Sequence, residues 1–316
     1  MSFMGRWRTN VVNQIPALVL VAMCVISTLM SDRFLSSTNI TNVLLQAAVL
    51  AVISVGMTFV VIGGGFDLSV GSIVGLSGCV AAEVMLRAGI LVGVICGIAT
   101  GAAVGLANGL VIARANVSPF IATLGSMVFV RGLALLMTKG APVVGDDGLP
   151  AGFIWFGTAR WFGIPWPVLA AIFIFAIFAW VLHKTAFGTR VFATGGSREA
   201  AFLSGVPVRR VTLQVYVICG ITAGIAGVML AARLQSGQPT AGEFYELTAI
   251  AAVVLGGAAL HGGEGYLYKT MIGVLIMTVL TNSLNLMGVD SYWQRIAIGV
   301  VIVAAAAADQ LRAKVN

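Results

Sequence analysis

The longest stretches of this chain without a charged residue leave few folds open to it. Residues 34–66 and 88–113 hold no Asp, Glu, Lys or Arg, and the chain of 316 residues is 59% hydrophobic and only 9% charged. A soluble domain carries roughly 25% charged residues. A transmembrane barrel would show short alternating segments instead of long apolar runs. The sequence therefore predicts an all-α polytopic membrane protein, with residues 1–316 forming a single transmembrane domain.

Uncharged windows of sufficient length place the membrane spans. A helix needs about 20 residues to cross the hydrocarbon core. The third and eighth spans decide the orientation of the rest, because loss of one of them alone would invert every later segment. We expect ten transmembrane helices, near residues 15–30, 43–62, 70–85, 90–113, 120–137, 166–182, 212–232, 247–260, 270–287 and 292–308.

Basic residues predict the orientation, since short cytoplasmic loops of membrane proteins carry an excess of Lys and Arg. Ten spans with a cytoplasmic N-terminus put the C-terminus in the cytoplasm as well. This arrangement places inside the basic residues Arg6, Arg8, Arg114, Lys184, Arg190, Arg198, Arg209, Arg210, Lys269, Arg312 and Lys314. Most acidic residues then fall outside: Asp32, Glu83, Asp146, Asp147, Glu243, Glu246 and Asp290. The distribution supports cytoplasmic N- and C-termini.

Glycine clusters, rather than prolines, are the expected places for breaks in the spans. Pro16 and Pro119 fall where helices are expected to begin, and there a missing N–H costs least. Two glycine-rich stretches, 63–71 and 256–265, lie at similar places in the two halves of the chain. Their placement indicates an internal duplication, which is common in membrane transport proteins.

Residues 183–211 form the longest polar interruption of the apolar sequence. Five of the eighteen Lys and Arg residues fall there: Lys184, Arg190, Arg198, Arg209 and Arg210. Ser197 can serve as the N-cap of a short helix, with Glu199 in its first turn complementing the helix dipole. Gly205 and Pro207 would end that helix. Such a helix on the cytoplasmic face can fit a groove of a partner protein; the alternative is an ordinary solvated loop.

Five polar side chains in or between the spans are candidates for a translocation path. Asp67 and Ser69 follow a glycine run, where a broken helix could present them to a solute, although either could simply cap the third helix. Asn282 and Asn285 are three residues apart on one helix face. Polar amides in a membrane face protein or water, so these two either bridge helices or contact a solute. Gln46 is open to the same two interpretations.

Residues 235–247 are too short and too polar to span the membrane. We expect a short re-entrant or interfacial element there, on the outer side. Glu243 and Glu246 could form an acidic surface for docking a basic partner, or a solvated edge. Arg131, within the fifth span, is expected to extend towards the outer surface or to pair with a carboxylate.

The sequence offers no support for catalysis or for a metal site. His183 and His261 fall in separate loops and form no triad or ligand cluster with other residues. The stretch 262–270 fails as a phosphate-binding loop, because Tyr268 stands where a glycine must precede Lys269. The chain itself is therefore not expected to bind ATP. The cysteines lack metal-ligand spacing and are expected to be buried reduced thiols: Cys24, Cys79, Cys96 and Cys219.

Several motifs, found in the same order along nearly the whole chain, resemble the permease subunits of ribose-type bacterial ABC sugar importers. One lies in the polar loop, where Gly195-Gly196 precedes Glu199-Ala200-Ala201 and then Leu203-Ser204-Gly205-Val206. The others are Gly64–Ser72, Phe120–Gly125, Gln238–Gly242 with Tyr245-Glu246-Leu247, and Ala249–Gly257 continuing into Asn282–Leu286.

The resemblance implies a type II importer-like permease of ten spans in the bacterial inner membrane. It would work by alternating access, with a second permease copy (identical or different), ATPase subunits that carry ATP and Mg²⁺, and a periplasmic sugar-binding protein. The cargo would be a monosaccharide, pentose or hexose, or a sugar-like solute. Membrane lipid is expected around it, and no nucleic acid. The ATPase would contact Gly196, Ser197, Arg198, Glu199, Ala200, Ala201, Leu203, Ser204 and Gly205.

A rival class is an ion-coupled secondary transporter of a small polar solute. Such a protein should carry coupling charges buried in mid-span, and only Asp67 comes close. Transport that persists in vesicles without any ATPase would favour this class.

Overall fold

The structure is a computed structural model that describes the backbone of residues 3–313 and the side chains of residues 14–307. Within that range it consists of α-helices and one short β-hairpin, β1 (Arg160–Trp161) paired antiparallel with β2 (Ile164–Pro165). The helices are α1 (Phe3–Met30), α2 (Ser37–Ile62), α3 (Val70–Ala88), α4 (Ile90–Arg114), α5 (Pro119–Thr138), α6 (Ala151–Thr158), α7 (Trp166–Lys184), α8 (Ala186–Gly196), α9 (Arg198–Leu203), α10 (Val208–Leu234), α11 (Tyr245–Leu255), α12 (Leu267–Leu286) and α13 (Ser291–Ala313).

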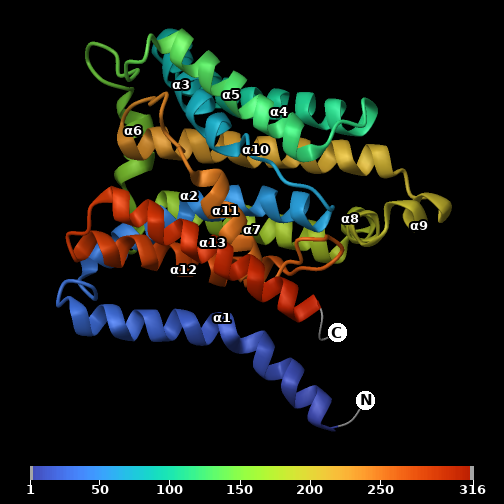
Figure 1. Ribbon diagram of the computed structural model, residues 1–316. Helices are drawn as coiled ribbons and strands as arrows, with labels where there is room; N and C mark the ends of the chain where they lie inside the picture. The colour runs from blue at the N-terminus through green and yellow to red at the C-terminus, as the bar shows by residue number, and fades with distance from the viewer. Residues whose placement is uncertain (1–2, 314–316) are drawn as a thin grey trace.

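The long helices lie side by side and run between two ends of one bundle (Figure 1). One end, here called the α9 end, carries α8 and α9. The opposite end, here called the α6 end, carries α6 and the β-hairpin. Helix α1 begins and α13 ends at the α9 end. The start of α1 and the end of α13 therefore lie at the same end of the bundle as the basic loop, residues 183–211.

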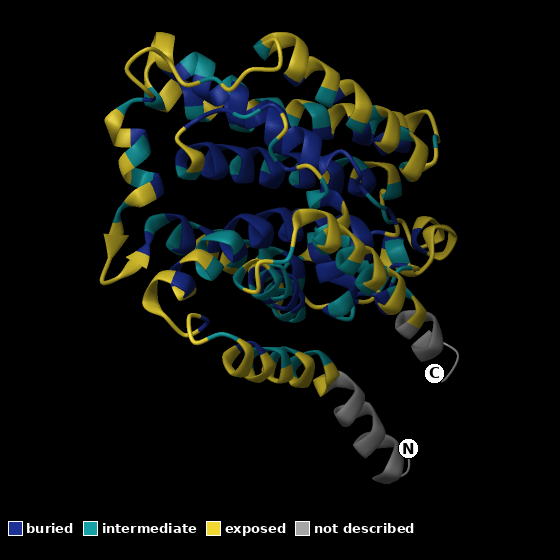
Figure 2. Ribbon diagram, turned by 60° about the vertical axis from the view of Figure 1, so that its left-hand side comes forward, coloured by how far each residue is buried: buried dark blue, intermediate teal, exposed yellow. Residues whose placement is uncertain are grey.

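Helices α2 and α10 form the centre of the bundle, where Figure 2 shows the densest buried surface. Helix α10 packs against α4, α3 and α2, while α2 also contacts α7, α11 and α12. Helices α4, α5 and α7 leave large apolar groups exposed, such as Leu91, Phe129 and Phe173. A helix can leave such groups outside when lipid rather than water surrounds it.

Small residues allow α4 and α10 to approach closely. A Cβ atom on Gly220 would lie 2.8 Å from the Cα of Gly105, and one on Gly101 would lie 2.8 Å from the Cα of Gly224. Both pairs repeat at four-residue spacing along one face of each helix. This small-residue seam is the kind that packs helices together in lipid, where no hydrophobic force drives them together.

Seven described helices are long and apolar enough to cross a membrane: α2, α3, α4, α5, α7, α10 and α12. Shorter apolar helices cover Gln14–Met30 of α1, all of α11, and Ser291–Ala307 of α13. The predicted polytopic helical membrane protein is confirmed. Helix α1 begins at Phe3, so Pro16 lies inside it and not at its start as expected.

Helices α3 and α11 both begin part-way along the bundle rather than at one of its ends (Figure 1). Each follows a non-helical segment that leaves one end of the bundle and runs back towards its middle (Figure 1). Residues 63–69 enter from the α9 end and lead into α3, whereas residues 235–244 enter from the α6 end and lead into α11. The polar residues 235–247 thus form a non-helical segment followed by the first turn of α11.

The two entering segments occupy corresponding places in the two halves of the bundle. The second glycine-rich stretch, 256–265, is instead a turn at the α9 end between α11 and α12. Its correspondence to residues 63–71 was predicted from glycine content and position in the chain. Glycine marks both a broken helix and a tight turn, so it could not distinguish the two uses.

Candidate functional site

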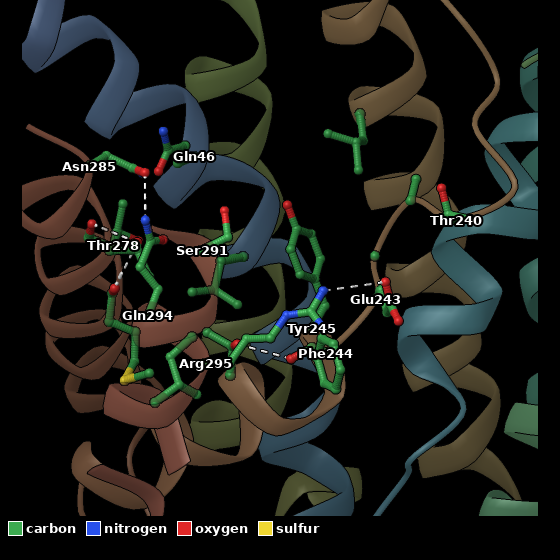
Figure 3. A pocket seen from close by; sticks show the side chains of 18 of the residues that line it. Gln46, Thr240, Glu243, Phe244, Tyr245, Thr278, Asn285, Ser291, Gln294 and Arg295 are labelled. Carbon is green, nitrogen blue, oxygen red and sulfur yellow. Dashed lines mark hydrogen bonds and ion pairs between the residues drawn. The ribbon is translucent and has the colours of Figure 1, made fainter. Parts of the chain in front are cut away.

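A cavity of about 550 Å³ opens between α2, α10, α11, α12 and α13 in the half of the bundle nearer the α6 end. One wall of the cavity is formed by residues 240–245, which are the last part of the entering segment 235–244 and the first residue of α11. Figure 3 shows amide, hydroxyl and charged groups converging there. The polar lining residues are Gln46, Arg233, Gln238, Thr240, Glu243, Tyr245, Thr248, Thr278, Thr281, Asn285, Ser291, Gln294 and Arg295.

Two pairs of side chains organise the side of the cavity formed by α13. Gln294 donates a hydrogen bond through Nε2 to Oδ1 of Asn285, at 2.8 Å, and a second to the carbonyl oxygen of Val289, at 3.0 Å. Arg295 pairs with Glu243 at 3.9 Å, and its guanidinium carbon lies 4.6 Å from the centre of the Phe244 ring. Arg295 and Glu243 are both more than half exposed, so their ion pair contributes little stability by itself.

The segment 235–244 turns sharply where it starts and where it ends. Gln235 and Phe244 both adopt the left-handed backbone conformation, with φ of 55° and 65°. Such values are uncommon for residues other than glycine and cost free energy, so surrounding contacts must hold them. This wall of the cavity is therefore fixed by tertiary contacts rather than by its own secondary structure.

Amide and hydroxyl side chains both donate and accept hydrogen bonds, as a sugar hydroxyl does. Gln46 and Asn285 supply amides to the cavity, while Thr278, Thr281 and Tyr245 supply hydroxyls. In residues 14–307, no group of three or more His, Cys, Asp or Glu side chains could hold a metal ion. The cavity is suited to a polar solute that both donates and accepts hydrogen bonds.

The structure brings together two of the predicted path residues. Gln46 of α2 and Asn285 of α12 both line the cavity (Figure 3). The other three, Asp67, Ser69 and Asn282, are buried and do not line it.

Asp67 and Ser69 instead fix the end of the entering segment 63–69. Oδ1 of Asp67 accepts hydrogen bonds from the Ser69 backbone N–H, at 2.9 Å, and from the Ser69 hydroxyl, at 2.6 Å. The amide of Asn108 on α4 donates to the same hydroxyl at 2.9 Å. Asp67 thus closes an Asx-type turn directly before α3. Neither residue caps α3 as considered from the sequence, because Ser69 makes no side-chain capping hydrogen bond and Asp67 accepts from Ser69, which precedes the helix.

Asn282 joins α12 to α2. Its side-chain amide exchanges two hydrogen bonds with the amide of Asn39, at 2.8 and 3.0 Å, and both residues are buried. A reciprocal amide pair of this kind satisfies both groups inside the bundle. Asn282 and its neighbour Asn285 therefore do different things although they share a helix face.

The two glutamates proposed for docking, Glu243 and Glu246, differ in how far they are buried. Glu243 is exposed at the rim of the cavity. Glu246 is only 9% exposed and lies in the first turn of α11, against Gly71 of α3. In this conformation Glu246 is a buried group of the bundle interior rather than part of an outer surface.

At the opposite end, α9 has the stops that the sequence indicated. The Ser197 hydroxyl accepts a hydrogen bond from the Ala200 N–H at 3.2 Å, Glu199 lies in the first turn, and Gly205 has a φ of 80°. Ala201 is buried while Leu203 is 78% exposed. The remaining residues proposed for ATPase contact are also exposed: Gly196, Arg198, Ala200 and Ser204.

Sequence reasoning missed two features of this end. Phe202 is 70% exposed beside Leu203 and gives α9 an apolar tip; a phenylalanine inside a polar loop was an available signal. It also missed α8, which places α9 at the end of a longer helical arm. The Thr185 hydroxyl caps that helix by accepting from the Gly188 N–H.

Helix α8 ends in a contact made by backbone alone, here called the glycine junction: Gly64, Gly195, Gly262 and Gly263. The Gly263 N–H donates to the carbonyl oxygen of Ile62 at 2.8 Å. A Cβ atom on Gly195 would lie 2.6 Å from the Gly263 nitrogen, and one on Gly262 would lie 2.8 Å from the Cα of Gly64. The end of α8 is therefore packed directly onto the turns that follow α2 and α11.

Comparison with known proteins identifies the family. Residues 39–306 match the family described as branched-chain amino acid transport system / permease component. The chain belongs to this permease family.

Individual relatives cover nearly all of this permease. It is 46% identical to the ribose import permease protein RbsC of Bacillus subtilis (strain 168) over 93% of this chain and 92% of that protein. It is 38% identical to the L-arabinose transport system permease protein AraH (89% and 85%) and 35% identical to the D-allose transport system permease protein AlsC (93% and 90%), both of Escherichia coli (strain K12). No solved structure shows significant similarity to the chain.

Proposed function

We propose that this chain is the transmembrane permease subunit of an ATP-driven ABC importer that carries a monosaccharide or sugar-like solute across the bacterial inner membrane. The observation that carries the proposal is the cavity of about 550 Å³ lined by amides and hydroxyls, in a permease whose relatives are named for ribose, allose and arabinose. Gln46 and Asn285 would contact sugar hydroxyls during passage.

The topology follows from the same proposal. All ten apolar helices would cross or enter the membrane, with α3 and α11 completing their crossings through the entering segments 63–69 and 235–244. The α9 end would face the cytoplasm, because α8 and α9 carry most of the basic loop. The α6 end and the cavity would then face the periplasm, where a sugar-binding protein delivers its cargo. Exposed Glu243 at the rim is the docking group that this arrangement favours.

The partners at the α9 end would be ATPase subunits, since this chain offers no phosphate-binding loop. Exposed Phe202 and Leu203 give α9 an apolar tip that could enter a groove, and Glu199 gives it a charge. The glycine junction joins α8 to two turns of the bundle, so movement of α9 is passed to α2, α3 and α12. A second permease copy would complete the membrane unit.

Reconstitution into proteoliposomes tests the proposal. The permease, its ATPase and its binding protein are combined, and uptake of radiolabelled ribose, allose and arabinose is measured with ATP inside. Uptake that requires ATP, ATPase and binding protein is expected. Uptake driven by an ion gradient in vesicles that lack the ATPase would instead establish the secondary-transporter class.

A further inference from the structure

Arg131 of α5 reaches across the bundle to the backbone of two other elements. Its Nη1 donates hydrogen bonds to the carbonyl oxygens of Pro239 and Ala241, the latter at 3.0 Å. Its Nη2 donates to the carbonyl oxygen of Gly71 at 3.1 Å. The sequence led us to expect a side chain extended to the surface or paired with a carboxylate. The structure shows a half-buried guanidinium bonded to three carbonyl groups.

The surface of α3 leaves space for this contact. A Cβ atom on Gly75 would lie 2.6 Å from Nη1 of Arg131 and 2.9 Å from the Pro239 carbonyl oxygen. One turn earlier, α3 touches the entering segment directly, because a Cβ atom on Gly242 would lie 2.6 Å from the Gly71 carbonyl oxygen. Two glycines of α3 thus admit both the guanidinium and the backbone that it holds.

Two of the three carbonyls that Arg131 binds, those of Pro239 and Ala241, belong to a segment with little secondary structure of its own. Backbone groups inside a membrane protein need partners, because lipid supplies none. Arg131 supplies them for Pro239 and Ala241. Residues 240–245, which continue from this point, line the cavity, whereas Arg131 itself does not. The guanidinium therefore lies behind the cavity wall and holds it against α3.

We propose that Arg131 is a positioning residue for transport: it fixes the segment 235–244, which carries the cavity wall, against α3 and so sets the shape of the sugar cavity. The role in transport rests on the proposed function of the cavity. A lysine cannot replace it, since one ammonium group lacks the planar fork that spans the carbonyls of two elements.

Cysteine labelling tests the positioning role directly. Thr240 and Ser291 are both exposed and both line the cavity, but Thr240 lies on the held wall and Ser291 on α13. Thr240→Cys and Ser291→Cys are each combined with Arg131→Lys and with Arg131→Gln, in membranes that contain the assembled importer. A membrane-impermeant methanethiosulfonate reagent is applied, and the labelling of the native cysteines alone is subtracted.

Loss of the hydrogen bonds from the guanidinium should change the labelling rate at position 240 by about tenfold and leave position 291 nearly unchanged. Equal rates at position 240 in all three Arg131 backgrounds would overturn the proposal. Equal changes at positions 240 and 291 would also overturn it, because they indicate a general loosening of the fold. If Arg131→Gln does not enter the membrane, Arg131→Lys keeps the long cationic side chain and still gives the comparison.

Uptake in the same membranes separates this proposal from the one on which it rests. Arg131→Lys should lower the maximal uptake rate about tenfold while binding-protein affinity for sugar is unchanged. The control is Arg87→Gln, which removes an exposed arginine paired with Glu83 on the same helix. Altered labelling at position 240 with normal uptake would support the hold on the wall but refute the cavity as the sugar path. Unaltered labelling would refute the role of Arg131 whatever happens to uptake.

Discussion

Substitution of Gly195 by alanine tests whether the glycine junction passes movement of α9 to the bundle. The backbone of Gly195 has an ordinary φ, so alanine is not excluded by conformation. The obstacle is space: its Cβ atom would lie 2.6 Å from the Gly263 nitrogen and closer still to the Ile62 carbonyl oxygen. Gly196 is the matched control, because a Cβ atom there would have no heavy atom from elsewhere in the described protein within 4 Å.

The cost of Gly195→Ala follows from this geometry. Ordinary van der Waals contact begins at 3.4 Å, so the backbone of Gly195 must move at least about 0.8 Å away from Gly263 and farther still from Ile62, and forced overpacking of this kind costs about 1–3 kcal/mol. The hydrogen bond from Gly263 to Ile62, now 2.8 Å long, would be weakened, at a further cost of about 1 kcal/mol. The total of about 2–4 kcal/mol exceeds the 1.4 kcal/mol that corresponds to a tenfold change in an equilibrium.

The assay is the ratio of sugar imported to ATP hydrolysed in proteoliposomes. Gly195→Ala should lower that ratio about tenfold, because α9 then moves without carrying the turns after α2 and α11 with it. Gly196→Ala should keep the ratio of the unsubstituted protein. Size-exclusion profiles and ATPase binding must be normal for both variants. A Gly195→Ala protein that is normally assembled and normally coupled would refute the reasoning.

Four further outcomes are expected. Asn282→Leu should lower the thermal unfolding temperature by leaving the Asn39 side-chain oxygen without its partner, at about 1–3 kcal/mol, while Asn39 Nδ2 keeps its hydrogen bond to the Phe34 carbonyl oxygen; adding Asn39→Leu should restore part of the lost stability. Asp67→Ala should lower the unfolding temperature more than Asp67→Asn, which keeps the Oδ1 acceptor; equal losses would contradict the turn assignment. Asn285→Ala should reduce the maximal uptake rate several-fold without changing thermal stability, as measured by uptake and by melting in detergent. Glu199→Lys should weaken ATPase co-purification or uncouple hydrolysis; normal coupling would remove Glu199 from the contact.

The helices could be predicted because lipid imposes a simple rule on sequence. A span must be apolar and about 20 residues long, and its backbone N–H and C=O groups must form hydrogen bonds with each other. Even α3 and the short α11 were expected, since Asp67 and the polar segment before Tyr245 interrupt the apolar runs. Helix α8 was not, because its sequence mixes glycine, threonine and arginine in the proportions of a loop. It is held as a helix partly by tertiary contacts with α7 and α10.

The candidate site was only partly predictable, for a related reason. A polar residue in an apolar span needs a hydrogen-bonding partner, but the sequence does not show whether that partner is protein or solute. Asn282 and Asn285 looked equivalent, yet one pairs with Asn39 and the other lines the cavity. Arg131 is charged and so needs a partner even more strongly, but the sequence again does not identify that partner. Its partners are backbone carbonyls, which every residue carries and no sequence motif marks.

The entering segment 63–69 gives a physical reason why the two ends of the bundle are linked. It starts at the glycine junction, where Gly64 lies against α8, and it leads into α3, whose Gly71 is bound by Arg131 beside the cavity wall. Buried hydrogen bonds at Asp67 fix the segment just before α3, so it cannot slip or lengthen without breaking them. A displacement at the α9 end therefore has a short, braced path to α3, whereas an unbraced loop of the same length would absorb it.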